Sequence, residues 1–148
     1  MPTPNERSRL RFDELADNPS PRVPICLALD VSTSMSGGKI DELNRALQLF
    51  LHAIERDEIA SLSAEIAMVS FGDGVMQLTD FSTVRESRAP RLVANGWAPL
   101  GEAVELSLDL LDQAKKVYAQ MGVDYYQPWL VLITDGQPTD NIGAAAAR

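Results

Sequence analysis

The sequence predicts an α/β domain in which a mostly parallel central sheet carries helices on both faces. Three apolar runs, at 23–30, 64–72 and 128–135, have the length and composition of buried strands. Amphipathic stretches at 39–57 and 99–120 fall between them. This alternation is typical of a parallel sheet, because each helix carries the chain back to the start of the next strand.

The first strand and the helix that follows it carry the clearest patterns. Residues 23–30, VPICLALD, are apolar up to Asp30, as in a strand buried on both faces. Cys26 lies inside this run and is the one cysteine of the chain, so we expect a small core residue and no internal disulfide. From Lys39 to Asp57, apolar residues recur every three or four positions, which predicts an amphipathic helix. The residues of this apolar face are Ile40, Leu43, Leu47, Phe50, Leu51 and Ile54.

A hairpin and a long helix are predicted next. The turn sequence Gly-Asp-Gly at 72–74 joins the strand-like runs 64–72 and 75–82, which predicts an antiparallel pair at one edge of the sheet. Pro99 then opens a helix that Gly122 ends. Proline is accommodated in the first helical turn, and glycine favours the position after the last turn.

The end of the sequence contains one more strand, and the chain divides into two parts. Residues 128–135, PWLVLITD, form an apolar run that ends in Asp135, and residues 142–148 begin like a helix. Residues 1–22 are polar and interrupted by prolines, so we expect an N-terminal extension. The predicted domain then covers 23–148.

Composition narrows the classes of function. A chain of 148 residues forms one domain. Its formal net charge of −8 disfavours nucleic-acid binding, which needs clustered lysine and arginine. No apolar stretch approaches the roughly 20 residues of a membrane-spanning helix. The polar N-terminus does not resemble a signal peptide, so we expect no membrane association and a cytoplasmic location.

Oxygen-bearing side chains gather where two predicted strands end. Asp30 and Asp135 each close an apolar strand, and Ser32 and Ser34 follow the first of them. Because neighbouring parallel strands end at the same edge of a sheet, the two carboxylates should meet beside the hydroxyls. Oxygen ligands without histidine or cysteine suit Mg²⁺ or Mn²⁺. The alternative interpretation is that such residues only cap helices and turns, which we expect for Thr33 and Ser36.

Two short motifs resemble a known family. The sequence D-V-S-T-S at 30–34 is similar to the metal-ion-dependent adhesion motif D-x-S-x-S of von Willebrand factor type A domains, and I-T-D-G at 133–136 resembles the later aspartate motif of that family. The stretches PLGEAVELSLDLLD and GVDYYQPWLVLITDGQPTDN look like the bacterial subgroup related to tellurium-resistance proteins. The resemblance covers residues 22–142.

The resemblance implies a Rossmann-like fold and a function. Ser32, Ser34 and Asp135 would hold a magnesium or manganese ion, and Asp30 would act directly or through water. The ion would then bind an acidic side chain of a protein partner. The chain would therefore be a metal-dependent protein-interaction module of a bacterial stress-response system, and not an enzyme.

The sequence departs from the family pattern in two places. Where the family has a sequence like G-G-T-P-L-G, residues 96–101 read G-W-A-P-L-G, so Trp97 and Ala98 replace a glycine and a ligand threonine. Trp97 is expected either to recognise a partner or to pack in the core. The family also has about six strands in the order 3-2-1-4-5-6, whereas this chain stops after the fourth. A sheet truncated there would leave residues 128–135 as an exposed edge that allows self-association.

Two other functions compete with this interpretation. The module is structural or degenerate if the loss of the threonine oxygen at Ala98 abolishes metal binding. A magnesium-dependent phosphoryl-transfer enzyme also places aspartates at strand ends, but its templates fit poorly. A P-loop needs G-x-x-x-x-G-K-[ST], and here Thr33 occupies the first glycine position and Ile40 follows Lys39. Phosphatases of the haloacid dehalogenase type resemble D-x-D, and here Ser32 holds the second place.

Overall fold

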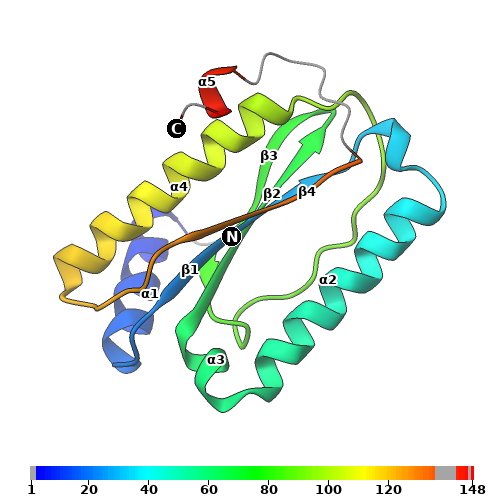
Figure 1. The fold of residues 1–148 in the computed structure, drawn as a ribbon. Coiled ribbons are helices and arrows are strands. Elements are labelled where there is room, and N and C mark those ends of the chain that lie inside the picture. Colours follow the sequence, from blue (N-terminus) through cyan, green and yellow to red (C-terminus); the bar gives the residue numbers. More distant parts are fainter. Residues whose placement is uncertain (1–2, 136–142, 147) are drawn as a thin grey trace.

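The computed structural model describes residues 3–135, 143–146 and 148, and its fold is the predicted α/β arrangement (Figure 1). Four strands form one sheet in the order β3-β2-β1-β4. The elements in chain order are α1 (Pro4–Asp17), β1 (Val23–Asp30), the 3₁₀ turn η1 (Thr33–Met35), α2 (Gly38–Arg56), α3 (Glu58–Ser63), β2 (Ala64–Gly72), β3 (Gly74–Ser82), α4 (Leu100–Met121), β4 (Trp129–Ile133) and α5 (Gly143–Ala146).

The sheet is parallel except at one edge. β1 pairs in parallel with β2 and with β4, and β3 runs antiparallel to β2 as the other half of the predicted hairpin. The predicted bounds of the first two strands are those observed, and β4 is three residues shorter than the predicted run 128–135. The helices 39–57 and 99–120 are confirmed within a residue or two as α2 and α4.

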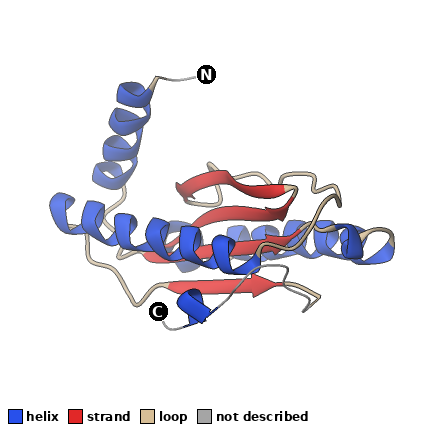
Figure 2. Cartoon of the chain, turned by 90° about the horizontal axis from the view of Figure 1, so that it is seen from above, coloured by secondary structure: helices blue, strands red, loops and turns tan. Residues whose placement is uncertain are grey.

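Side chains alternate across β1 and divide the core into two layers. Cys26 and Ala28 face α4, together with Leu15 of α1, while Leu27 and Leu29 face α2. Figure 2 shows the helices on both sides of the sheet. The α2 layer contains most of the predicted apolar helix face, but Phe50 at its margin is exposed. The first strand is buried on both faces, as its unbroken apolar run predicts.

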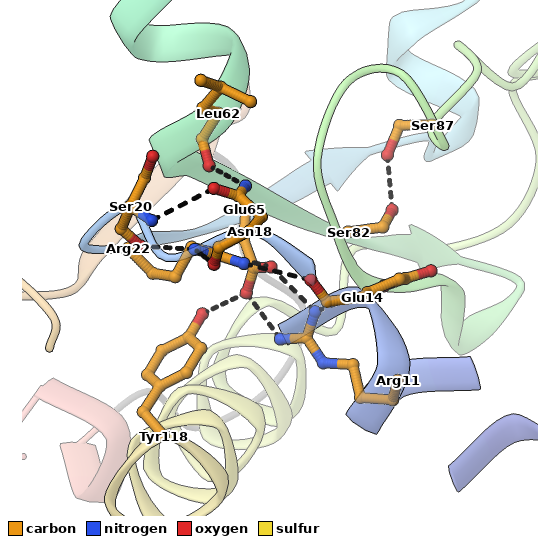
Figure 3. Close-up of polar contacts among 10 residues, drawn as sticks. All are labelled: Arg11, Glu14, Asn18, Ser20, Arg22, Leu62, Glu65, Ser82, Ser87 and Tyr118. Atoms are coloured by element: carbon orange, nitrogen blue, oxygen red, sulfur yellow. Dashed lines mark hydrogen bonds and ion pairs between the residues drawn. The ribbon is translucent and has the colours of Figure 1, made fainter. Parts of the chain in front are cut away.

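A buried charge cluster joins the N-terminal segment to the sheet (Figure 3). Glu65 of β2 accepts two hydrogen bonds from Arg11 of α1 (2.8 and 2.5 Å) and one from Arg22 Nε (3.2 Å). The hydroxyl of Tyr118 on α4 donates to the same carboxylate (2.5 Å). Burial alone would raise the pKa of Glu65, but the hydrogen bonds and charge of Arg11, with Tyr118 and Arg22, hold it below its usual range. The predicted polar extension 1–22 thus contains a helix that is tied to the sheet by Glu65.

The outer strand of the sheet is only partly covered. β4 is the last strand in the sheet order of the described residues, and Trp129 (62% exposed) and Leu132 face solvent. Its apolar run alone predicts a strand buried on both faces, but among the described residues β4 is an exposed edge strand, as expected for a sheet that ends at this strand. None of the described helices combines the length and the apolar character that a membrane span requires.

Candidate metal-binding site

The two predicted aspartates lie side by side at the carboxyl edge of the sheet. β1 and β4 are direct neighbours, with Leu29 opposite Ile133, so the residues that follow them emerge at the same edge. The backbone nitrogen of Asp135 is 3.4 Å from Asp30 Oδ2. Two residues 105 positions apart in the sequence are thereby brought together, as parallel neighbours require.

Asp30 is buried, and both of its carboxylate oxygens accept hydrogen bonds. The N–H of Ser32 donates to Oδ1 (2.9 Å), which fixes the turn that leaves β1. The hydroxyl of Thr134 donates to Oδ2 (2.7 Å) and links the ends of β1 and β4. Thr134 was not predicted from the sequence, although it directly precedes Asp135. These contacts make Asp30 the residue that positions the edge, with only its remaining lone pairs available to a ligand.

The two predicted serines form a close pair of oxygens. Their hydroxyls lie 2.9 Å apart and share a hydrogen bond. Two ligands at adjacent corners of an octahedron around Mg²⁺, each about 2.0–2.1 Å from the ion, are separated by about 2.9 Å. Ser32 is buried and Ser34 is exposed, so the pair opens toward solvent. Thr33 and Ser36, which the sequence predicts as turn residues, have exposed side chains at the same turn.

Lys39 is a charged neighbour of the site that the sequence analysis missed. Its ammonium group lies 3.7 Å from Asp135 Oδ2, and the lysine is 59% exposed whereas the aspartate is 10% exposed. Lys39 belongs to the first turn of α2, so the contact depends on how that helix packs against the sheet. The positive charge of Lys39 stabilises the carboxylate of Asp135, and it would repel a cation bound to that carboxylate. A metal ion therefore has to compete with the lysine side chain for Asp135.

A second loop is fixed against the serine loop by backbone hydrogen bonds. The N–H of Asn95 donates to the carbonyl of Val31 (2.6 Å), and the N–H of Thr33 donates to the carbonyl of Gly96 (2.9 Å). A pocket of about 550 Å³ opens between the two loops. Its lining consists of Ser32, Thr33, Ser34, Asn95, Gly96, Trp97 and Ala98. The pocket therefore brings the hydroxyl-bearing residues of the serine loop next to Trp97 of the second loop.

The donor set fits a hard divalent cation. Within the described residues, no three His, Cys, Asp or Glu side chains gather into a metal-binding cluster. The set instead consists of two carboxylates, at Asp30 and Asp135, and the hydroxyl pair of Ser32 and Ser34. All four side chains carry oxygen atoms, the ligand type that Mg²⁺ and Mn²⁺ prefer, and Mg²⁺ commonly keeps several waters. Ala98 is among the residues that line the pocket, and its side chain has no oxygen to offer as a ligand.

Comparisons with known proteins support the fold. No protein-family model matches the chain, and the curated proteins contain no significant match. Among solved structures, the chain is similar to the vWF domain of the type V pili tip protein Mfa5 from Porphyromonas gingivalis. The two share 18% sequence identity with a TM-score of 0.56, over 80% of this chain and 39% of that chain.

A second structure contains the three N-terminal domains of the same pili tip protein. It is also 18% identical, with a TM-score of 0.49, over 80% of this chain and 20% of that chain. The matched part of this chain covers 39% of the length of the first structure, that is, less than half of it. The four-stranded α/β architecture and the similarity to the first structure show that the chain has the fold of a von Willebrand factor type A domain.

Proposed function

We propose that the chain is a metal-dependent protein-interaction module. Ser32, Ser34 and Asp135 hold Mg²⁺ or Mn²⁺ at the carboxyl edge of the sheet, and Asp30 fixes their positions or binds through water. The ion supplies a positive charge with exchangeable water positions. An acidic side chain of a protein partner replaces one of those waters. The fold of the solved vWF domain supports an interaction module, and the metal is our extension of it.

One observation carries the proposal. The ends of two distant strands meet at one edge, where the backbone N–H of Asp135 contacts the Asp30 carboxylate, and the Ser32 and Ser34 hydroxyls that follow Asp30 have the spacing of adjacent magnesium ligands. A helix cap or a turn would explain each residue alone. It would not explain why two distant strands both end in an aspartate at the edge where the hydroxyl pair lies.

Calorimetric titration with Mg²⁺ and Mn²⁺ tests the proposal. Wild-type protein is expected to release or absorb heat on binding one ion, and Ser34→Ala is expected to weaken binding by about tenfold or more. Ser36→Ala is the matched control, since it removes an exposed hydroxyl from the same turn. Its affinity should equal that of the wild type. Equal affinities for all three proteins, or no binding by the wild type, would contradict the assignment.

Ala98→Thr tests whether the site is weakened by its missing oxygen. A threonine hydroxyl at this pocket-lining position is expected to raise Mg²⁺ affinity by about tenfold, because it adds one ligand to a partly hydrated ion. Ala98→Val adds similar bulk without the oxygen and is the control. If threonine and valine change the affinity equally, position 98 has no role in metal binding.

Other sequence-based expectations stay predictions. They include the tellurium-resistance-related subgroup, the stress-response role and the lack of catalysis. Self-association through the outer edge of β4 is a further proposal, and the exposed side chains of Trp129 and Leu132 support it. The main competing proposal is a structural module that binds no metal. The two titration experiments above distinguish that proposal from the metal-dependent module.

A further inference from the structure

Trp97 is displayed to solvent beside the proposed metal site. It is 77% exposed, and it lines the same pocket as Ser32 and Ser34. Core packing, one of the two roles expected from the sequence, is therefore wrong for this residue. Tryptophan is usually buried over most of its surface, and exposed tryptophans are enriched at positions that dominate protein interfaces.

The backbone that carries Trp97 is held on both sides. The residue before it, Gly96, accepts a hydrogen bond from Thr33, and Asn95 donates to Val31. The residue after it, Ala98, is 3% exposed, and its carbonyl accepts from Leu100 at the start of α4. The indole thus projects from a loop that is tied to the serine loop and to a long helix. Such an aromatic group loses little conformational freedom when it is covered by a partner.

The pocket offers two kinds of surface to one ligand. Ser32, Thr33 and Ser34 line it from the serine loop, and Asn95, Gly96, Trp97 and Ala98 line it from the second loop, where the indole of Trp97 is the large exposed apolar group. Its volume of about 550 Å³ is within the range of pockets that hold a small ligand, so it has room for more than a carboxylate.

We propose that Trp97 selects the partner, and that the partner is a peptide segment in which an aspartate or glutamate adjoins a large apolar or aromatic side chain. This inference rests on the proposed function. The acidic group binds the metal at Ser32 and Ser34, and the neighbouring side chain packs on the exposed indole of Trp97. An acidic group alone would be bound weakly and without selectivity, because the metal recognises only charge. The apolar contact supplies the discrimination.

Selection from a random peptide library displayed on phage tests this inference. The full chain is immobilised in Mg²⁺, and bound phage are eluted with EDTA. Wild-type protein is expected to recover peptides with an acidic residue beside Phe, Trp, Leu, Ile or Met. Trp97→Ala should recover acidic peptides without apolar enrichment, while Ile59→Ala, which removes an exposed apolar side chain of α3, should behave like the wild type. Circular dichroism verifies that each variant is folded.

Binding of one recovered peptide, made synthetically, gives the quantitative result. Trp97→Ala is expected to weaken the binding of that peptide by about tenfold or more. The Mg²⁺ affinity of the free protein should change less than twofold. Acidic peptides without apolar neighbours in the wild-type pool, or equal peptide affinity for Trp97→Ala and wild type, would overturn the role of Trp97 alone. Failure to recover any EDTA-eluted acidic peptide would overturn the proposed function, and this inference with it.

Discussion

Glu65→Ala is expected to lower the free energy of unfolding by about 3–5 kcal/mol. The substitution leaves Arg22 and Arg11 without the buried carboxylate that both contact, and it removes the acceptor of the Tyr118 hydroxyl. A buried charge without its partner costs far more than an exposed one, because little water replaces the lost interaction. Urea unfolding followed by circular dichroism at pH 7 measures the change.

The control and the pH dependence separate this effect from a simple loss of charge. Glu55→Ala removes an exposed carboxylate from α2 and should change stability by less than about 0.5 kcal/mol. The folded-state pKa of Glu65 lies below its usual range, so its contribution is present above about pH 4.3 and is lost as the pH falls through the folded pKa. The difference in free energy of unfolding between wild type and Glu65→Ala should therefore decrease in acid. If Glu65→Ala lowers the free energy of unfolding at pH 7 no more than Glu55→Ala does, the buried charge cluster around Glu65 does not stabilise the fold.

Gly96→Ala is expected to destabilise the protein and to disturb the metal site together. Gly96 has a φ of +85°, and a Cβ at this position would lie 2.4 Å from the backbone nitrogen of Asp73 in the β2–β3 turn. The unfavourable φ costs about 1–2 kcal/mol, and the contact adds about 1–3 kcal/mol because the obstructing atoms belong to the backbone. The loop must shift, and its hydrogen bond to Thr33 shifts with it.

Gly74→Ala is a matched control for this prediction. Gly74 has nearly the same φ, +86°, but nothing lies within 4 Å of a Cβ built there. The control therefore contains the backbone strain without the collision. Thermal unfolding and Mg²⁺ titration should show a larger stability loss for Gly96→Ala and a weakened affinity for that variant only. Equal losses for the two glycines would mean that the two loops are not in close contact.

Much of the fold follows from the hydrophobic pattern. The apolar run 23–30 and the three-to-four spacing in 39–57 report directly on burial, so strands and helices appear where the pattern places them. The meeting of Asp30 and Asp135 follows from a second rule, that neighbouring parallel strands end at one edge. These features depend on the local hydrophobic pattern and on the topology that it implies, and both can be inferred from the sequence.

The contacts that the sequence did not indicate are tertiary. Arg11 and Arg22 lie in a polar segment that the sequence predicts as an N-terminal extension, and their partner Glu65 lies at the start of a strand. Nothing in the local sequence pairs them. The approach of Lys39 to Asp135 likewise depends on the packing of α2. Helix packing and side-chain reach decide such contacts, and periodicity does not encode them.

Locating a bound ion by NMR tests the central claim most directly. Mn²⁺ broadens the signals of nuclei near it, so substoichiometric Mn²⁺ added to ¹⁵N-labelled protein maps the site. We predict that the amide signals of Ser32, Thr33, Ser34 and Gly96 broaden first and recover on addition of excess Mg²⁺. The amide of Glu65, at the opposite end of the sheet, should be unaffected at the same concentration. Broadening centred on the acidic stripe of α4 (Glu105, Asp109 and Asp112), with the serine loop unchanged, would contradict a metal site at this edge.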